Sequence, residues 1–352
     1  MLYCPLSMKL RVFRGTLPFH YPFTISGGRT KEVQETLIVS LSEDEVSGYG
    51  EAPVINYYQI NLNDLAAKAL QFKAEIESFP SQNPYAFNEL LIDLFPADSF
   101  LRCALDCAFW DLLVRRAGTS IAHLAQLTLP AKIACDYTLG IDTSEKMLLK
   151  MQALPWPVYK IKVGFEGDAN LFNHLCLHTD AMFRLDANAA WTQKEALNFI
   201  QRIDTGRIEF IEQPLKRELL SEMEELTKST KMLFIADEDF RTLDDLNNCL
   251  GSFGGINIKL TKCGGITPAL EIIREARKHG LKIMLGNMNE STIGTWSLLQ
   301  LAGEADFTDA DGPLLLNGDY AGGLIYEHGF VHIPPKADRI VIKQNSMQEI
   351  KS

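Results

Sequence analysis

The chain has 352 residues, of which 46% are hydrophobic and 22% are charged, and its formal net charge is −11 at pH 7. This length and composition are typical of a globular protein with one large domain and a smaller one. The acidic net charge argues against nucleic acid as a partner. No apolar run approaches the ~18 residues that a membrane-spanning helix requires, so we expect no membrane partner.

Residues 1–13 lack the charged leader, apolar core and small-residue cleavage site of a signal peptide. The seven cysteines are scattered, and none of them forms a C-x-x-C pair. Cys103 and Cys107 lie one helical turn apart, a spacing that suits buried thiols better than a disulfide or a zinc site. We therefore expect a cytoplasmic protein.

The N-terminal part predicts a small α+β domain. Its strand-like runs lie at 10–13, 36–41 and 48–53, and they predict an antiparallel sheet of about three strands. Between the first two runs, Pro22 to Thr30 contains adjacent glycines and predicts a mobile loop. Apolar residues then recur with helical spacing over 62–72 and 100–116, and Gly118 follows as a helix stop.

From about residue 132 onward, strand-like runs alternate with amphipathic helical stretches. The starts of the eight runs lie 23 to 26 residues apart, and the runs are 133–139, 158–163, 182–186, 208–212, 232–237, 255–260, 281–286 and 305–309. Eight strands at this spacing, each but the last followed by a helix, predict a (β/α) barrel. The alternative, a doubly wound open sheet, lacks a glycine fingerprint after its first strand.

The strand-like run 158–163 carries two lysines. Because side chains alternate along a strand, Lys160 and Lys162 share one face, while Ile161 and Val163 share the other. Two ammonium groups about 7 Å apart on a buried face are costly unless carboxylates or a metal lie opposite them.

Charged residues stand near the ends of five successive barrel strands. They are Lys162, Asp186, Glu212, Asp237 and Lys259, at intervals of 24, 26, 25 and 22 residues. Barrel enzymes place their active groups at the carboxyl ends of the strands, so we expect these side chains to converge around one mouth.

The three carboxylates of this set predict a Mg²⁺ site, because Mg²⁺ takes oxygen ligands and no histidine or cysteine accompanies them. The alternative is that each acid caps a helix or pairs with a surface lysine. Lys162 and Lys259 would face the metal from two sides as an acid/base pair. A lysine base needs its pKa lowered from about 10.4 toward neutrality, which Lys160 or Mg²⁺ would achieve.

Five motifs in this order resemble the enolase superfamily, in its muconate-lactonising branch. The motifs are Lys160-Ile161-Lys162, Asp186-Ala187-Asn188, Glu212-Gln213-Pro214, Asp237-Glu238, and Asn257-Ile258-Lys259 followed by Gly264-Gly265. The resemblance implies a modified TIM barrel, (β/α)7β, with an N-terminal α+β capping domain completed by the C-terminal segment. It also implies Mg²⁺ and abstraction of a proton next to a carboxylate to give an enediolate.

The eighth strand is similar to the paired-aspartate signature of the dipeptide epimerases, in Asp309-Ala310-Asp311-Gly312-Pro313. In that family the pair holds the free α-ammonium of the substrate, a task that suits two carboxylates on one face. The alternative is a pair of solvated acids at the end of a loop.

Two loops of the capping domain would govern the substrate side chains. Arg29 lies near the place where family members acting on glutamate-containing dipeptides carry an arginine. Phe19 and Ile25 suggest an apolar cavity instead. Tyr57 and Tyr58 in the second loop either wall the cavity or pack on the sheet.

We therefore interpret the chain as a Mg²⁺-dependent dipeptide epimerase for small or hydrophobic dipeptides, and as a homo-oligomer. Lys162 and Lys259 are the predicted catalytic residues, and Lys160 assists them electrostatically. The alternatives are an Ala-Glu dipeptide epimerase, an o-succinylbenzoate synthase, an N-acylamino acid racemase or a cycloisomerase, and, in a different class, a catalytically silent binding barrel. The predicted divisions are 1–125 for the cap, 126–320 for the barrel and 321–352 for the returning segment.

Overall fold

The structure is a computed structural model, which describes residues 8–25, 28–80 and 82–351 and, within these, leaves out the side chains of Ile25 and Arg29. The strands are β1 (Lys9–Ile25), β2 (Arg29–Glu43), β3 (Val46–Pro53), β4 (Lys132–Ala134), β5 (Tyr137–Leu139), β6 (Val158–Lys162), β7 (Met182–Asp186), β8 (Ile208–Glu212), β9 (Phe234–Ala236), β10 (Gly255–Ile258), β11 (Lys282–Gly286), β12 (Phe307–Asp309), β13 (Ala321–Gly322), β14 (Ile325–Glu327), β15 (Phe330–His332), β16 (Val341–Ile342) and β17 (Gln348–Ile350). The helices are α1 (Leu62–Gln71), α2 (Lys73–Glu77), α3 (Pro84–Leu94), α4 (Ser99–Ala117), α5 (Ile121–Leu124), α6 (Ser144–Ala153), α7 (Asp168–Cys176), α8 (Gln193–Gln201), α9 (Leu220–Ser229), α10 (Leu246–Cys249), α11 (Leu260–Cys263), α12 (Ile266–Lys278), α13 (Thr292–Leu299) and α14 (Gly312–Leu315).

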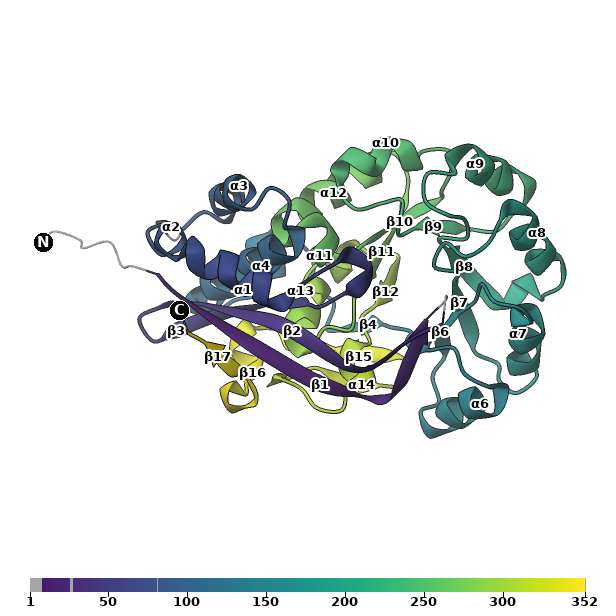
Figure 1. Cartoon of the computed structure of the whole chain (residues 1–352), viewed down its shortest axis with the longest axis horizontal. Helices are drawn as coiled ribbons and strands as arrows, with labels where there is room; N and C mark the ends of the chain where they lie inside the picture. The colour runs from purple at the N-terminus through teal and green to yellow at the C-terminus, as the bar shows by residue number, and fades with distance from the viewer. Residues whose placement is uncertain (1–7, 26–27, 81, 352) are drawn as a thin grey trace, which may run out of the picture.

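Strands β5 to β12 form one parallel sheet of eight strands in chain order, which curves into a barrel (Figure 1). Helices follow seven of the strands, and the eighth is followed by the four-residue α14. The two edge strands meet where Asp136 N donates to Thr308 O at 3.4 Å. This arrangement confirms the predicted (β/α)7β barrel.

The first predicted barrel run, 133–139, was wrong as a single strand. Its first part is β4, which pairs antiparallel with β15 outside the barrel, and its last part is β5, which pairs with β6. Cys135 and Asp136 separate the two strands. The fully buried Asp136 carboxylate bonds to Arg184, which lies on β7 inside the barrel, so the chain leaves the outer sheet at this point.

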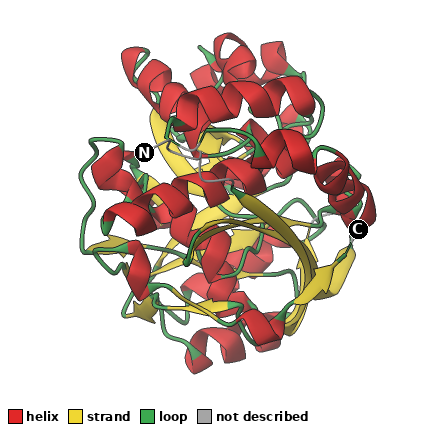
Figure 2. Cartoon of the chain, turned by 90° about the vertical axis from the view of Figure 1, so that its left-hand side faces the viewer, coloured by secondary structure: helices red, strands yellow, loops and turns green. Residues whose placement is uncertain are grey.

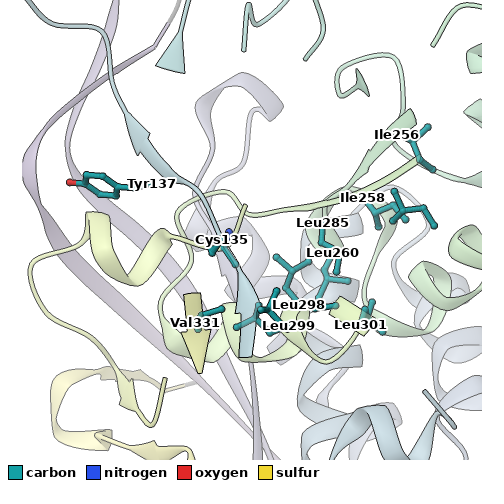
Figure 3. Close-up of a cluster of buried hydrophobic side chains, with 14 of the residues drawn as sticks. Cys135, Tyr137, Ile256, Ile258, Leu260, Leu285, Leu298, Leu299, Leu301 and Val331 are labelled. Atoms are coloured by element: carbon teal, nitrogen blue, oxygen red, sulfur yellow. Dashed lines mark hydrogen bonds between the residues drawn. The ribbon is translucent and has the colours of Figure 1, made fainter. Parts of the chain in front are cut away.

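The alternation of side chains along the barrel strands separates the core from the site. Asn257 and Lys259 point their polar groups to the interior, where they bond to Glu212 and Asp237. Ile256 and Ile258 face outward and belong to the main hydrophobic core. In Figure 3 these two side chains lie in one group with Leu260 of α11, Leu285 of β11, and Leu298 and Leu299 of α13.

The capping domain is an antiparallel sheet in the order β17-β1-β2-β3, covered by α1 to α4. Helix α4 confirms the helix predicted over 100–116, and Gly118 ends it with a φ of 64°. Strand β3 approaches α4 very closely. A Cβ atom on Gly50 would lie 1.9 Å from Ala104 O, so a side chain cannot fit there without moving the strand.

Strands β1 and β2 form a long hairpin that extends from the capping sheet to the barrel (Figure 1). The predicted mobile loop from Pro22 to Thr30 was therefore wrong in extent, because strand pairing continues through Phe23 with Lys31 and Ile25 with Arg29. Residues 26 and 27 lie outside the described residues. At the barrel end, Ile141 N donates to Thr24 O at 2.8 Å.

The C-terminal segment contacts both parts of the molecule. Strands β14 and β15 extend β4, whereas β17 pairs with β1 and completes the capping sheet. Arg115 of α4 also donates to Ile340 O at 3.3 Å. In Figure 2 helices cover the top of the molecule, and strands reach its right-hand edge near the C-terminus. No described helix combines the length and hydropathy needed to cross a membrane.

Two buried carboxylates join the cap to the barrel. Glu51 of β3 accepts hydrogen bonds from Ser291 Oγ at 2.6 Å and from Gly294 N at 3.0 Å, at the start of α13. Asp106 of α4 accepts from Thr267 Oγ1 at 2.6 Å and Thr267 N at 3.0 Å, at the start of α12. Since each acid satisfies N–H groups at a helix start, these bonds fix the cap over the barrel.

Candidate active site

A cavity of about 330 Å³ lies at the carboxyl ends of the barrel strands, below the hairpin and the loop after β3. It is lined by polar residues from the barrel and by mostly apolar residues from the cap. The lining residues are Phe23, Thr30, Lys31, Ile55, Asn56, Tyr57, Tyr58, Thr138, Lys160, Lys162, Asn188, Asp237, Glu238, Lys259, Asn287, Met288, Asn289, Asp309 and Asp311. All the predicted catalytic lysines and acids either line this cavity or bond to a residue that does.

The β6 lysines bind carboxylates on the neighbouring strands. Lys162 Nζ lies 2.6 Å from Asp186 Oδ2, and Lys160 Nζ lies 2.7 Å from both Glu212 Oε2 and Asp309 Oδ2. Burial opposes ionisation of Asp186, but Lys162 and Lys160 outweigh it and hold its pKa below the ordinary value. Asp186 is therefore ionised at neutral pH.

Asp237 lies between two lysines. Lys259 Nζ donates to Asp237 Oδ2 at 2.8 Å, and Lys262 Nζ donates to Asp237 Oδ1 at 2.6 Å. Burial opposes ionisation of Asp237, yet the two lysines lower its pKa far below the ordinary value. Lys262 also donates to the carbonyl oxygens of Phe240 and Asn257, at 2.7 and 3.1 Å. It therefore holds the loop after β9 against β10.

The pKa of Lys259 is shifted in the opposite direction from the lowering that the sequence analysis predicted for a lysine base. Burial alone would lower its pKa, but Asp237 and Glu212 outweigh burial and raise it above the ordinary value. The expected lowering by Lys160 is present as a smaller contribution. Neutralising the negative charge beside a lysine of this kind leaves burial to lower its pKa.

Lys162 and Lys259 face one another across the barrel mouth. Their strands, β6 and the end of β10, are four strands apart in a sheet of eight, with β7, β8 and β9 between them. Each lysine is 9% exposed and lines the cavity. A substrate placed over the carboxylates would therefore have one ammonium group on each side.

Asp186, Glu212 and Asp237 supply oxygen atoms alone, which is the donor set that Mg²⁺ takes. Asp186 and Asp237 each disfavour the charge on Glu212, and burial, the largest contribution, also raises the pKa of Glu212 above its ordinary value. Buried acids that oppose each other's ionisation need cations, which lysines supply in this structure. The residues present therefore fit a hard divalent cation.

Glu238 is a further acid at this end of the cavity that the sequence analysis left without a role. Its Oε2 atom is buried and has no hydrogen-bond partner among the described residues. Burial and the nearby Asp237 and Asp186 raise its pKa to about 8. Its position directly after Asp237 in the sequence is the signal that could have drawn attention to it.

Asp136, Asp309 and Asp311 form a second acidic group, whose ligand atoms all lie within 4.8 Å of one another. This group is a poorer candidate for a metal site than the three carboxylates at the ends of β7, β8 and β9. Arg184 is bonded to Asp136 at 2.9 Å and also donates to Thr308 O at 2.8 Å. A guanidinium fixed on several sides cannot make room for an ion.

The predicted ammonium-binding pair, Asp309 and Asp311, lines the cavity. Asp309 is engaged by Lys160, whereas Asp311 Oδ2 accepts from the backbone N of Thr138 at 2.5 Å. Asn287 Nδ2 lies 3.4 Å from Asp311 Oδ1. Both acids are buried and not solvated, which contradicts the alternative of loop-end surface acids.

The cap side of the cavity is mainly apolar. Tyr57 and Tyr58 both line it, with their rings 5.0 Å apart in an edge-to-face arrangement. Phe23, Ile55 and Met288 complete the apolar lining. The predicted specificity residues Ile25 and Arg29 stay predictions, because their side chains lie outside what the structure describes.

Several cavity residues were missed by the sequence analysis. Lys31 on β2 is a cation among the apolar cap residues, with Nζ 3.1 Å from Val54 O. Asn257 Nδ2 donates to Glu212 Oε1 at 2.7 Å. Asn257 is not among the lining residues, and the sequence analysis named it in the motif with Lys259 but gave it no role, although the two share one face of the strand. Thr138 and Asn287 carry no comparable signal in the sequence.

A family model, two relatives and one solved structure agree with the resemblance found in the sequence. The family model for the “Enolase C-terminal domain-like” family matches residues 145–337. The L-Ala-D/L-amino acid epimerase of Flavobacterium johnsoniae is 37% identical, over 92% of this chain and 96% of that protein. The hydrophobic dipeptide epimerase of Flavobacteria bacterium strain MS024-2A is 31% identical, over 94% and 96%. A solved structure, the dipeptide epimerase of Enterococcus faecalis V583 complexed with Mg and L-Leu-L-Tyr, matches with a TM-score of 0.89 at 28% identity, over 96% of this chain and 100% of that chain.

Proposed function

The chain belongs to the enolase C-terminal domain-like family, and from this premise we propose that it is a Mg²⁺-dependent dipeptide epimerase. The reaction is a 1,1-proton transfer at the carbon next to the substrate carboxylate, through an enediolate, so the enzyme is an isomerase. Relatives named L-Ala-D/L-amino acid epimerase and hydrophobic dipeptide epimerase support this assignment over nearly the whole chain.

The observation that carries the proposal is the pair of opposed lysines over three carboxylates. Lys162 and Lys259 lie four strands apart around the mouth, and both open on one cavity. One lysine removes the α-proton from its face, and the other delivers a proton to the opposite face. This division of work inverts the centre without moving the substrate.

The metal would be held by Asp186, Glu212 and Asp237. When bound, Mg²⁺ supplies positive charge that stabilises the substrate carboxylate as charge develops on it and weakens the hold of Asp237 on Lys259. Lys160 assists from beside Glu212, at 2.7 Å. Lys262 keeps Asp237 in place through Oδ1, at 2.6 Å.

The substrate class follows from the other two walls of the cavity. Asp309 and Asp311 offer carboxylates to a free α-ammonium, which an N-acylated amino acid or a muconate lacks. The apolar lining from Phe23, Ile55 and Met288 favours small or hydrophobic side chains. We therefore propose free dipeptides with such side chains as substrates, in preference to Ala-Glu.

A screen of dipeptides in deuterated water tests the proposal, with deuterium at the α-carbon read by mass spectrometry. We expect Mg²⁺-dependent exchange in free dipeptides with small or apolar residues. Absence of exchange in every dipeptide would contradict the function. A kinetic preference for Ala-Glu that is lost in Arg29→Ala would contradict the substrate class alone.

Three further expectations complete the proposal. We propose that the chain divides into a cap (1–125), a barrel (126–320) and a returning segment (321–352). We also propose that it works as a homo-oligomer in the cytoplasm. The cysteines at positions 103, 107, 135, 176, 249 and 263 are free thiols, which suits a reducing compartment. Analytical ultracentrifugation measures the oligomer, and a single protomer mass would contradict it.

A further inference from the structure

The acidic group of Asp136, Asp309 and Asp311 extends behind the wall of the cavity. Asp309 and Asp311 line the cavity, whereas Asp136 lies behind them on the short link between β4 and β5. The three side chains are nearly inaccessible to solvent, with exposures of 0% for Asp136, 5% for Asp309 and 1% for Asp311. The inference below rests on the proposed function, because it concerns the subsite for the substrate ammonium.

Asp136 has one carboxylate oxygen without a partner. Its Oδ2 accepts from Arg184 Nη1 at 2.9 Å, but its Oδ1 is buried and has no hydrogen-bond partner among the described residues. An unpaired buried carboxylate oxygen is costly unless it carries or shares a proton. One oxygen of Asp136 lies within 4.8 Å of one oxygen each of Asp309 and Asp311, so the three acids oppose one another's ionisation and titrate as a coupled group.

Two cations, Lys160 and Arg184, bond to two of the three acids, and both cations are shared with other carboxylates. Lys160 divides its charge between Asp309 and Glu212, at 2.7 Å from each. Arg184 Nε also bonds to Glu209, at 2.6 Å.

Asp311 has no ion-pair partner among the described residues and accepts from the neutral donors Thr138 N and Asn287 Nδ2. Three acids this close cannot all be ionised with so little positive charge beside them.

We propose that Asp136 is a third acid of the ammonium subsite, and that the three carboxylates share one proton that leaves for solvent when the substrate ammonium binds beside Asp309 and Asp311. The exchange balances, because one cation enters the group from the cavity and one proton leaves it. Asp136 does not touch the substrate. It is a positioning residue that sets the charge which Asp309 and Asp311 present.

The surroundings of the group support a proton that is held near neutral pH. Burial and Asp309 raise the pKa of Asp311 to about 7. Burial and Asp309 likewise raise the pKa of Asp136, against the opposing charge of Arg184. The other titratable or charged groups that face the three acids are Cys135, Tyr137, Lys160, Lys162, Lys259 and Tyr326.

Calorimetric binding of L-alanyl-L-alanine to the Mg²⁺-loaded enzyme tests the proposal. The heat is measured at pH 6 in buffers of different ionisation enthalpy, and the slope gives the protons released, because heat from epimerisation is the same in every buffer. At pH 6 the dipeptide's own amine is already fully protonated. We expect wild type to release about one proton per dipeptide.

Asp136→Asn should at least halve this release, because the remaining two acids hold the proton less strongly. The control is Asp306→Asn, since Asp306 precedes β12 and pairs with Arg277 and Lys282, outside the group. It should release as many protons as wild type. A wild-type enzyme that binds the dipeptide without releasing a proton would overturn the proposal, as would unchanged release in Asp136→Asn.

Potentiometric titration of the ligand-free protein gives a readout that needs no dipeptide. Between pH 8 and pH 5.5, wild type should take up about one proton more than Asp136→Asn or, if that variant fails to fold, than Asp311→Asn. Equal uptake would overturn the shared proton. Failure of the proposed function shows differently, as no α-deuterium exchange in any dipeptide.

Discussion

Buried carboxylates lie both at the cavity and at the junction of cap and barrel, and the two sets differ in their partners. At the cavity, Asp186 and Asp237 bond to lysines, which hold their pKa values below the ordinary value against the effect of burial. At the junction, Glu51 and Asp106 bond to neutral donors at helix starts, and burial raises the pKa of each to about 7.

The difference separates two uses of the same side chain. At Asp186 and Asp237 the lysine partners keep the carboxylates ionised at neutral pH, so these charges are present for a metal ion. A helix start holds a carboxylate by several hydrogen bonds, with too little charge to prevent protonation near neutrality. Under the proposed function the cavity acids serve the chemistry, whereas the junction acids hold the cap on the barrel.

The largest effect should come from removing one cavity charge. Asp237→Asn should abolish turnover at saturating Mg²⁺, because a neutral amide is a poor ligand for a divalent cation. The fold should survive, since Lys262 keeps three carbonyl acceptors, Asp237 O, Phe240 O and Asn257 O. Circular dichroism measures whether the fold is kept, and a kinetic assay measures turnover, with Asp306→Asn as the control. Retention of more than about a tenth of the activity would contradict the metal assignment.

The cavity lysines should split epimerisation into two half-reactions. Lys162→Ala and Lys259→Ala should each stop epimerisation, while the surviving lysine still exchanges the α-proton of one stereoisomer with deuterated water. Mass spectrometry on each pure isomer measures the exchange. Lys68→Ala removes a lysine that pairs with Asp98 in the cap and should leave both reactions intact. Equal loss of exchange for both isomers in both cavity variants would argue against opposed bases.

Asp311 sharpens the comparison, because it lies at the cavity but bonds to neutral donors as the junction acids do. Asp311→Asn should lower kcat/KM for free dipeptides roughly ten- to a hundredfold, the worth of one charge-assisted hydrogen bond. Affinity for N-acetylated dipeptides as inhibitors should change far less. Competition assays with matched pairs measure the ratio, and an equal loss for both would remove Asp311 from the ammonium subsite.

The smallest effect concerns the junction and appears as a dependence of stability on pH. Because burial raises the pKa of Glu51 from 4.5 to about 7, folding retains a proton that the unfolded chain loses. The stability that protonated Glu51 contributes is therefore fully present below about pH 4.5. This contribution is lost as the pH rises through about 7.

Glu51→Gln should reduce the fall in the free energy of unfolding between pH 5.5 and 8 by up to about 2 kcal/mol. Urea unfolding at several pH values measures this change. Glu349→Gln is the matched control on the same sheet, because its salt bridge with Arg11 lowers the pKa of Glu349 out of this window. An equal fall in Glu51→Gln and wild type would show that the carboxylate is ionised throughout this pH range.

The sequence predicted the barrel well because its signals are local. Strand spacing and side-chain alternation place Lys160, Lys162 and Lys259 on inward faces, and the structure has them there. Pairing across long distances carries no such signal. The run at 133–139 reads as one strand, yet its first residues pair with β15, almost two hundred residues later.

The candidate site was predictable where a side chain follows the strand period and unpredictable where a loop supplies it. Asp136 and Arg184 illustrate the limit, because charged residues inside a barrel contradict the expectation of an apolar core. Helix α3 was also missed, although Asn83 caps it and Pro84 begins it. Thr138 and Asn287 matter through their hydrogen bonds to Asp311, which the one-dimensional pattern does not reveal.

The pairing of β17 with β1 has a consequence for synthesis on the ribosome. Arg11 on β1 and its partner Glu349 on β17 are 338 residues apart. At about 5–20 residues per second, β1 waits roughly 20–70 s for this neighbour after it has been translated. During that time the edge of β1 at Val12 to Arg14, which β17 later covers, has unpaired backbone groups, and nascent chains can associate through such groups. A chaperone that covers this edge would have most to contribute before translation ends.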